Sequence, residues 1–505
     1  MKKCDVAIIG SGAGGTACAI ILCKLGYKVT LIERGSHPRF ALGESGTPAL
    51  SRKMRFLGRA YGIPEFEAMA TYDNIESSGI EVLCGPKEAF HYFVHRKGQT
   101  DPGEFGAVPE IIVHTSEMDV QYNRAAFDKK LLDVAISYGA QYYDHSKVEN
   151  IEFNEQGALI DCRNEGKVFT VSADFVVDAT GHNSVIGEKF GLKISGEDLE
   201  TPLKSRSIFT HFKNIGSFDD EIKKSKMCSD GSLIPRSHAT QHHCFDGGWV
   251  WFIPFDNGVT SVGINLDIDQ YPENDKDPMV EFWEIANQYP IVAALLEGRE
   301  NVIPFFKTGR MQFMNRELVG DRWAMLPASA YGLDGWFSTG LAATFLSVHR
   351  LVELLHGDVL KNGHYRREAL LDYEKAIKKE YFHAAKMIHG VYKSFKHFEI
   401  FRNYCFLCFM GAESYLEKGG AGKGMDLGHL LLSAGDSGFI DKFNIIYDRV
   451  ISDFNLDKID AEEEKFFNDF IRNEMLEYNL RNFGDPQCYG VYPRRVAPMP
   501  EYALD

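Results

Sequence analysis

The sequence predicts an α/β fold in which a parallel sheet forms first, a β-rich region follows, and helices end the chain. Two apolar strand-like runs, residues 4–9 (CDVAII) and 28–33 (KVTLIE), flank a helical stretch at 13–25. This strand–helix–strand order is typical of a βαβ unit with a parallel sheet. From about residue 341, apolar residues recur every three to four positions, which predicts a helical final third.

The other expected elements follow from the same periodicities. Strand-like runs lie at 147–153, 158–162 and 168–177, and a β-rich middle region lies at 206–213, 241–255 and 258–266. Helical periodicity predicts helices within 341–355, 365–401 and 462–480. The polar stretches 216–232 and 268–278 are expected to be linkers.

Charge and hydropathy exclude several classes of protein. The chain has 505 residues and a formal net charge of −16, so it repels nucleic acid and anionic membranes. The apolar run at the start is too short for a signal peptide, and no 18-residue apolar run suggests a membrane span. We therefore expect a cytoplasmic protein, a monomer or a homodimer, with neither nucleic acid nor membrane as a partner.

Cysteine and histidine patterns predict no metal site. The ten cysteines are scattered along a long chain, which is not typical of a disulfide framework. Cys405 and Cys408 lie in an apolar, aromatic run, where we expect two thiols on one helix face. His242 and His243 are adjacent in a predicted strand and should point to opposite faces, as residues at the edge of a sheet.

A glycine-rich turn, Gly10-Ser11-Gly12-Ala13-Gly14-Gly15, links the first strand to the first helix. In a GxGxxG turn the first glycine makes the bend, the second lets the backbone approach a pyrophosphate, and the third lets helix and strand lie close. Glu33 ends the second strand about 20 residues later, where a carboxylate accepts the ribose hydroxyls. The pattern predicts a dinucleotide site formed by Gly10, Gly12, Ala13, Gly15 and Glu33.

Three further segments distinguish FAD from NAD. A strand ends in Asp178-Ala179-Thr180-Gly181, a Gly320-Asp321 pair precedes an apolar strand, and Arg124 lies at the start of a helix. In this order the segments resemble the FAD-dependent aromatic monooxygenase fold family over most of residues 1–350. The resemblance implies that Asp321 holds the ribityl chain and that Arg124 lies along the cofactor. It implies further FAD contacts from Asp178, Arg34, Ser45, Val148, Gly340 and Leu341.

Two motifs narrow the resemblance to flavin-dependent halogenases. Residues 38–48 read PRFALGESGTP, and residues 249–254 read WVWFIP, which is similar to the WxWxIP motif of that family. Period-two spacing puts Trp249 and Trp251 on one face of a strand that Pro254 ends. Such bulky indoles are suited to separating the flavin chamber from the substrate chamber.

The segment from Asp334 to Leu341 (DGWFSTGL) resembles the halide-binding segment of the same family. Backbone N–H groups at such a turn bind anions, so Thr339 and Gly340 are the candidate halide ligands. The sequence departs from the family at Gly335, where a proline is usual. Phe337 replaces the glutamate that precedes the serine in tryptophan halogenases, which favours a phenolic substrate, most like the phloroglucinol-type branch.

One lysine completes the resemblance. Halogenases carry a lysine in a strand beside the substrate chamber, and Lys87 lies among apolar and aromatic residues at the matching place. Burial should lower its pKa and make the amine a better acceptor of electrophilic halogen. The rival, Lys97, lies in a predicted turn.

The resemblance thus implies a Rossmann-like FAD-binding domain of the glutathione-reductase and p-hydroxybenzoate-hydroxylase type. We expect an FAD-binding halogenase core at 1–355 with a β-sheet substrate region inserted at about 195–310, and a helical substrate-side domain at 356–505. The implied enzyme is a two-component halogenase. A separate flavin reductase supplies FADH2, since the chain has a single GxGxxG turn. FADH2, oxygen and chloride or bromide then give hypohalous acid, which passes to Lys87 and halogenates a small phenol.

Two alternatives stay open at this point. In the first alternative, the chain is an FAD-dependent aromatic hydroxylase, which shares the fold but does not account for the WxWxIP motif. In the second, it is a catalytically silent flavoprotein that acts as a binding module, and the departure at Gly335 supports this alternative.

Overall fold

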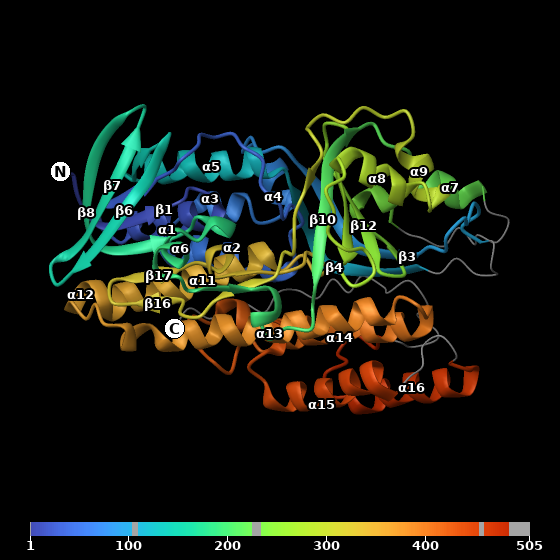
Figure 1. Ribbon diagram of the computed structural model, residues 1–505. Coiled ribbons are helices and arrows are strands. Elements are labelled where there is room, and N and C mark those ends of the chain that lie inside the picture. Colours follow the sequence, from blue (N-terminus) through green and yellow to red (C-terminus); the bar gives the residue numbers. More distant parts are fainter. Residues whose placement is uncertain (1, 104–109, 225–233, 454–458, 484–505) are drawn as a thin grey trace.

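The computed structural model describes residues 2–103, 110–224, 234–453 and 459–483. Figure 1 shows the parallel sheet and its helices in one half of the molecule and a second sheet in the other half, with long helices beneath both halves. The fold class predicted from the sequence is confirmed, including the helical final third.

The first sheet carries the glycine-rich turn. Its parallel strands are, in order, β17 (Trp323–Met325), β8 (Lys167–Asp178), β1 (Lys2–Ile9), β2 (Val29–Ile32) and β5 (Gln141–Tyr143). The antiparallel β16 (Val319–Gly320), β6 (Ser146–Asn154) and β7 (Gly157–Asn164) extend this sheet. Ile9 pairs with both Ile32 and Asp178, so three carboxyl ends meet at one edge. Helices α1 (Ala13–Lys24) and α5 (Arg124–Ser137) pack together beside this sheet.

The second sheet, which we call the substrate sheet, combines two distant parts of the chain. Its order is β14 (Phe306–Lys307), β10 (Ser205–Lys213), β13 (Val259–Asp267), β12 (Gly248–Pro254), β11 (Ala239–Phe245), β3 (Cys84–Val94) and β4 (Glu110–Tyr122). The sequence placed this sheet at about 195–310, whereas β3 and β4 lie well before that range. They join because β3 pairs in parallel with β11.

Each face of the substrate sheet has its own cover. One face packs on α8 (Pro278–Ala286) and α9 (Pro290–Leu296) through a cluster that includes Val250 and Phe252. The other face, which carries Trp249 and Trp251, belongs to the main core together with the C-terminal helices. We call this second face the inner face.

The C-terminal helices close the inner face. Helix α11 (Gly340–Leu354) packs against α1 and α2 (Pro48–Tyr61), and α13 (Leu371–Ser394) packs against α14 (Phe398–Glu417). In Figure 1, α13 and α14 together run beneath both sheets, with α15 (Ser437–Asp448) and α16 (Ala461–Glu474) outside them.

The remaining described elements are short. They include α3 (Pro64–Ala68), α4 (Tyr72–Ser78), α6 (Val185–Phe190), α7 (Phe218–Lys224), α10 (Pro327–Ala330), α12 (Leu360–Asn362), and a small sheet of β9 (Lys193–Ser195), β15 (Phe313–Asn315) and β18 (Tyr331–Gly332).

Several predicted boundaries differ from the structure. The region 365–401 holds all of α13 and the start of α14, because the chain leaves the helix after Ser394 and a new helix begins at Phe398. The expected helix at 462–480 ends at Glu474. The expected linker 216–232 contains α7, and its last residues lie outside the described ones.

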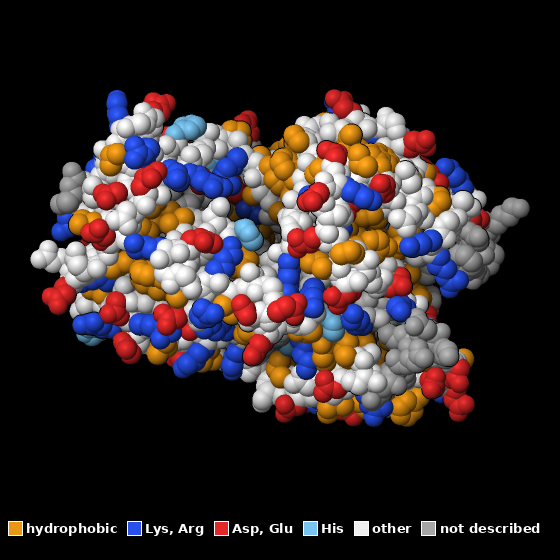
Figure 2. Space-filling model, in the orientation of Figure 1, with side chains coloured by type: hydrophobic (Ala, Val, Ile, Leu, Met, Phe, Trp, Pro, Cys, Tyr) orange, Lys and Arg blue, Asp and Glu red, His pale blue; other side chains and the backbone are white. Residues whose placement is uncertain are grey.

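Surface and hydropathy add two observations. Lys, Arg, Asp and Glu side chains intermingle over the face shown in Figure 2, which is hollowed between the part that carries α5 and the part that carries β10. In the part of the chain that the structure describes, no helix is long and apolar enough to cross a membrane.

A buried ion pair joins α11 to α13. Arg350 donates to Glu380 at 2.8 Å, with side-chain exposures of 1% and 5%, and the same carboxylate accepts a hydrogen bond from the backbone N–H of Leu431. Replacing Glu380 by glutamine removes the charge that compensates a buried guanidinium. We expect the free energy of unfolding, measured with urea, to fall by about 3 kcal/mol.

The control for this change is Asp372→Asn. Asp372 pairs with Lys375 on the exposed side of the same helix, so its loss should change stability by about 0.5 kcal/mol or less. Equal effects of the two substitutions would contradict the assignment of Arg350 and Glu380 as a helix-joining pair.

Candidate functional site

The glycine-rich turn has the conformation that its motif predicts. Gly10 has φ 102°, and a Cβ there would lie 2.3 Å from the carbonyl oxygen of Ala179. A Cβ on Gly15 would lie 2.1 Å from the carbonyl oxygen of Gly10. Only glycine fits these positions, so α1 begins close against β1 and presents its N-terminal N–H groups at the carboxyl edge of the sheet.

Glu33 lies at the same edge and is 6% exposed. One of its oxygens, Oε2, accepts hydrogen bonds from the backbone N–H and hydroxyl of Ser11 and from Arg39, and the other accepts from the backbone N–H of Gly35. Burial by itself raises the pKa of Glu33, but Arg39 and these donors outweigh it and lower the pKa. The carboxylate is therefore ionised at the place where a ribose would meet it.

Arg124 links α5 to the segment that carries the GES motif. Its guanidinium forms a two-bond pair with the buried Asp128 and donates to the carbonyl oxygens of Leu42 and Gly43. A Cβ on Gly12 would lie 3.8 Å from both Arg39 and Asp128. The structure thus brings Arg124, Arg39 and the glycine-rich turn together. Arg39 is a residue that the sequence analysis missed.

Two other predicted FAD residues lie around this edge. Arg34 is exposed beside the 178–183 turn and donates to Asn183 at 3.3 Å. Val148 lies on β6, two residues after Ser146, whose backbone N–H donates to the carbonyl oxygen of Glu33. Direct FAD contacts of both residues stay predictions.

Asp178, which was expected to contact FAD, has hydrogen bonds that indicate a structural role. It is completely buried, and its two oxygens accept hydrogen bonds from the backbone and hydroxyl of Thr180 and from the backbone N–H of Ile186. Burial raises the pKa of its carboxyl. The structure therefore uses Asp178 to hold the turn after β8, and a direct contact with FAD is not what its hydrogen bonds indicate.

The expectation for Asp321 needs a correction of the same kind. Asp321 precedes β17, and β17 runs parallel to β8, so Asp321 lies at the amino end of the strands, opposite the glycine-rich turn. Its carboxylate accepts from Arg366 and from the backbone N–H of Arg367. At the carboxyl end of β17 the chain forms α10, where Ser329 accepts a hydrogen bond from the N–H of Gly181. Residues of α10, and not Asp321, adjoin the dinucleotide edge.

The expected halide segment lies beside the cofactor helix. A Cβ on Gly14 of α1 would lie 2.7 Å from the methyl group of Thr344 on α11. Ser338 has φ 55°, in the left-handed region, and Thr339 has φ −81°, in the right-handed region. This alternation makes successive backbone N–H groups converge. Gly340 and Leu341 begin α11, where N–H groups have no acceptor within the helix. The geometry suits an anion.

The departure at Gly335 leaves room for a larger residue. A Cβ there would meet no atom within 4 Å, and the φ of Gly335 is not positive. The loop is held instead by Asp334, whose carboxylate accepts from Ser205 on β10, from Tyr392 on α13 and from the backbone N–H of Trp336. Burial raises the pKa of Asp334 to about 6.

The two expected barrier tryptophans face the same side of β12. Trp249 donates to the hydroxyl of Tyr392 at 3.0 Å, and Trp251 donates to the hydroxyl of Ser261 at 3.1 Å. Trp251 lies over Gly263, where a Cβ would be 2.2 Å from the indole. Pro254 ends the strand, as expected. The orientation is confirmed, and the barrier function stays a prediction.

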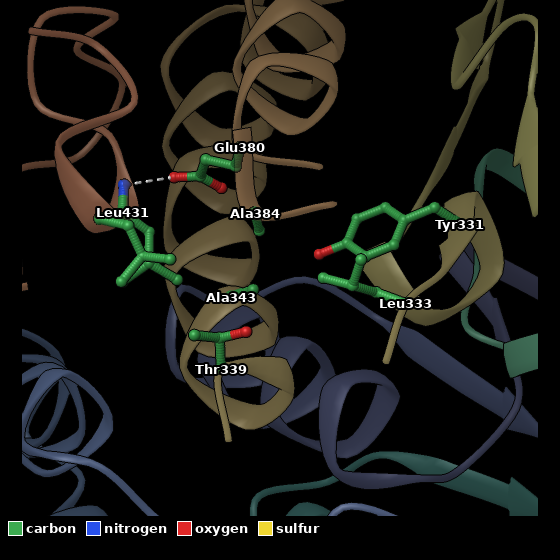
Figure 3. A pocket seen from close by; sticks show the side chains of 8 residues that line it. Tyr331, Leu333, Thr339, Ala343, Glu380, Ala384 and Leu431 are labelled. Carbon is green, nitrogen blue, oxygen red and sulfur yellow. Dashed lines mark hydrogen bonds between the residues drawn. The ribbon is translucent and has the colours of Figure 1, made fainter. Parts of the chain in front are cut away.

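A small pocket adjoins Thr339 (Figure 3). Thr339 and Ala343 of α11, Glu380 and Ala384 of α13, and Tyr331 with Leu333 line it, together with Leu431 and Leu432. Its volume is about 10 Å³, room for about one water molecule. Because a carboxylate forms one wall, the pocket disfavours an anion.

Lys87 is completely buried at the start of β3. Its ammonium nitrogen donates to the hydroxyl of Ser45 and the carbonyl oxygen of Gly46, both at 2.7 Å, and lies 3.5 Å from the centre of the Phe90 ring. The Ser45 hydroxyl also bonds Thr240. The GES segment therefore contacts Lys87, in addition to the FAD contact predicted for Ser45. Lys97, by contrast, is exposed in a turn, as expected.

An irregularity in pairing turns Lys87 toward the inner face. Lys87 pairs with Asp119, but Ala89 pairs with His114, so the register between β3 and β4 shifts at this point. Strand alternation would put Lys87 and Phe90 on opposite faces, and such irregularities redirect side chains. Burial lowers the pKa of Lys87 to about 7, while the nearby Asp119 raises it. The burial and the lowered pKa that the sequence predicted are confirmed.

Next to Lys87, four rings form a closed group that we call the aromatic box: Tyr92, His242, Trp249 and Trp336. Ring centres are 4.4 Å apart for Tyr92 and His242, 5.3 Å for His242 and Trp336, and 5.0 Å for Trp336 and Trp249. Phe90 lies 6.3 Å from His242 and joins the box to the lysine. The sequence assigned His242 and His243 to a sheet edge, which is wrong, since β11 is an interior strand.

The residues at the carboxyl edge fit FAD. The close glycine turn leaves space for a pyrophosphate at the start of α1, Arg39 and Arg124 supply positive charge, and the ionised Glu33 suits a ribose. Among the residues that the structure describes, no group of histidine, cysteine or acidic side chains could hold a metal ion.

Comparisons with known proteins find an FAD-binding family and several halogenases. Residues 3–245 match the FAD binding domain family. The chain is 33% identical over 350 residues to tetracycline 7-halogenase of Kitasatospora aureofaciens, which covers 67% of this chain and 61% of that protein. It is 32% identical over 367 residues to monodechloroaminopyrrolnitrin halogenase PrnC of Pseudomonas fluorescens, covering 70% and 62%. The chain thus spans about three fifths of the length of these relatives.

A solved structure extends the likeness to nearly the whole chain. The crystal structure of halogenase PltM with phloroglucinol and FAD matches with a TM-score of 0.86 and 23% identity, covering 95% of this chain and 98% of that one. The chain is therefore similar to FAD binding domains over residues 3–245 and has the fold of halogenase PltM over nearly its whole length. In sequence it is similar to halogenases, over about three fifths of their length.

The hydroxyl of Tyr392 offers a direct test of how the loop is held. It donates to Asp334 at 2.8 Å and accepts from Trp249, so Tyr392→Phe leaves the buried indole N–H of Trp249 without a partner and removes one of the donors to the Asp334 carboxylate. We expect a loss of about 2 kcal/mol in the free energy of unfolding and a change in tryptophan fluorescence.

Tyr404→Phe is the matched control. Tyr404 is equally buried on α14, but its hydroxyl has no hydrogen-bond partner in the described chain. Its removal should leave stability and fluorescence nearly unchanged. A Tyr392→Phe variant as stable as this control would disprove the link.

Proposed function

We propose that this chain is a two-component, FAD-dependent halogenase that substitutes chlorine or bromine onto an electron-rich phenol. The observation that carries the proposal is the buried amine of Lys87, which contacts Phe90 beside the aromatic box, while Trp336 joins the same box to the halide-type loop. The relatives named above are halogenases, and the PltM structure holds a phenol, phloroglucinol, which supports the same chemistry here.

The site divides into three tasks. Gly10, Gly12, Ala13, Gly15 and Glu33 hold the cofactor, with Arg39 and Arg124 facing its phosphates. The amides of Thr339 and Gly340 hold the halide. Reduced FAD, once bound, supplies with oxygen the oxidising power that converts a halide to hypohalous acid. Trp249 and Trp251 keep the phenol out of the place where this oxidation occurs.

Lys87 then carries the halogen to the substrate. Its neutral amine attacks the halogen of hypohalous acid, so an N–halogen bond forms, the O–halogen bond breaks, and one amine hydrogen leaves with the oxygen as water. A ring carbon of the phenol next attacks the halogen. The C–halogen bond forms, the N–halogen bond breaks, and the ring hydrogen ends on the amine. The lowered pKa of Lys87 keeps a neutral amine present near neutral pH.

The partners follow from this division. The described chain has one glycine-rich dinucleotide turn, at Gly10–Gly15, so the hydride for FAD comes from a separate reductase. The substrate is a phenol because Phe337, an apolar residue, stands before Ser338, and the electron density for attack comes from the substrate's own hydroxyl.

Substitution of Lys87 tests the proposal. Lys87→Ala removes the amine, and Lys87→Arg keeps a cation that stays protonated and takes halogen poorly. Both variants should lose at least about 100-fold in halogenated product while reoxidation of FADH2 in air continues at a near-normal rate. Product is measured by mass spectrometry of a small phenol panel with reductase, FAD and each halide.

Lys97→Ala is the control, since Lys97 is an exposed turn residue. It should halogenate at the rate of the unmodified protein. Product that forms without halide, or a hydroxylated product alone, would instead identify a monooxygenase. Normal halogenation by Lys87→Ala would refute the role of the amine.

The acidic limb of the pH profile should depend on Asp119. Lys87 titrates together with the buried Asp119, and protonation removes the neutral amine, so halogenation should fall as the pH drops below the lowered pKa of Lys87. Asp119 raises this pKa, so Asp119→Asn should move the limb to lower pH, and its amide can still accept from Ser51. The measurement is the rate of halogenation against pH with preformed FADH2. A limb that stays in place or moves to higher pH would contradict the assignment.

A further inference from the structure

The aromatic box contains three buried polar atoms that lack a partner in the described chain: the hydroxyl oxygen of Tyr92, His242 Nε2 and Trp336 Nε1. His242 and Trp336 are 1% and 0% exposed, and neither His242 Nε2 nor Trp336 Nε1 has a hydrogen-bond partner in the described chain. Leaving such atoms unpaired is costly, and a native protein seldom does so without a reason. The rings of His242 and Trp336 are neighbours, with centres 5.3 Å apart at an angle of 60°.

Neighbouring rings differ in this respect. The indole N–H groups of Trp249 and Trp251 both donate to hydroxyl oxygens. On the opposite face of β11, His243 is as deeply buried as His242, but its Nδ1 lies 2.8 Å from Nε2 of His95. Unpaired polar atoms also occur elsewhere on the sheet, on His91, Asp119 and Gln121, so the distinguishing feature of the box is that His242 and Trp336 carry theirs on neighbouring rings.

Hydrogen bonding fixes the chemical character of each atom. His242 Nδ1 lies 3.1 Å from the carbonyl oxygen of His91, so Nδ1 carries the hydrogen and Nε2 offers a lone pair. Burial also lowers the pKa of His242 to about 3, which keeps the ring neutral. Trp336 Nε1 is a donor only. One acceptor and one donor side by side are complementary to a hydroxyl group.

The box lies within reach of the reacting amine. Phe90 contacts Lys87 on one side and His242 and Tyr92 on the other, and Phe401 and Phe409 of α14 pack on the same rings. A single phenylalanine therefore links the box to the lysine.

We propose that His242 and Trp336 recognise the hydroxyl group of the aromatic substrate: His242 Nε2 accepts its hydrogen, and Trp336 Nε1–H donates to its oxygen. This inference rests on the proposed halogenation of a phenol and specifies how the phenol is selected. Accepting the hydroxyl hydrogen pushes electron density into the ring, at the ortho and para carbons that an electrophilic halogen attacks. Aryl ethers, which have no hydrogen to donate, are poor substrates.

The test compares resorcinol with 1,3-dimethoxybenzene. The unmodified protein should halogenate resorcinol and strongly prefer it to the ether. His242→Phe should lower kcat/KM for resorcinol by about 10- to 100-fold and leave the value for the ether within about threefold. His242→Gln, which keeps an acceptor oxygen, should recover part of the preference, and Trp336→Phe should weaken it in the same direction.

His243→Phe is the matched control, because it makes the same change one residue away on the opposite face. Binding is also measured without turnover, as quenching of tryptophan fluorescence when resorcinol is added to the FAD-loaded protein without reductase. His242→Phe should weaken this binding, and His243→Phe should not.

The outcomes separate two failures. If the unmodified protein halogenates no phenol, the proposed function itself fails. Suppose instead that the unmodified protein halogenates resorcinol. If the His242→Phe and Trp336→Phe variants then keep both the kcat/KM for resorcinol and the preference for resorcinol over the ether, the recognition proposal is wrong. The same conclusion follows if His243→Phe and His242→Phe lose the preference equally.

Discussion

The buried carboxylate of Asp334 is the constraint on which the rest of the site depends. It accepts hydrogen bonds from β10, from α13 and from its own loop, and one of these donors, Tyr392, also receives the indole N–H of Trp249. A single acid thus connects the substrate sheet, the C-terminal helices and the loop that starts α11. A buried carboxylate is costly unless fully hydrogen-bonded, so these three elements are held in one relative position.

The substrate sheet divides the chemistry between its two faces. Alternation along β11 sends His242 inward and His243 outward, and alternation along β12 sends both tryptophans inward and Val250 and Phe252 outward. The outer face is an ordinary apolar contact with α8 and α9. On the inner face, strand β3 adds Lys87, which faces inward only because its pairing with β4 is irregular.

Local motifs could be predicted from the sequence, and topology could not. The glycine turn, Glu33 and the two tryptophans depend on spacings of a few residues, and the structure orients them as expected. Asp321 failed because a Gly-Asp pair says nothing about which end of a strand it occupies. His242 was misplaced because period-two spacing does not distinguish an interior strand from an edge. Tyr392 acts through contacts with distant segments, which no local pattern encodes, whereas Arg39 pairs with Glu33 only six residues away.

Burial around the aromatic box also decides the chemical state of the cysteines that lie there. Cys244 follows His242 on the inner face of β11, and Cys405 and Cys408 lie buried on α14 near Tyr92. Burial raises the pKa of all three thiols. The same dry environment that lowers the pKa of the Lys87 amine therefore keeps these sulfur atoms protonated, whereas the thiolate is the form of cysteine that oxidants attack most readily.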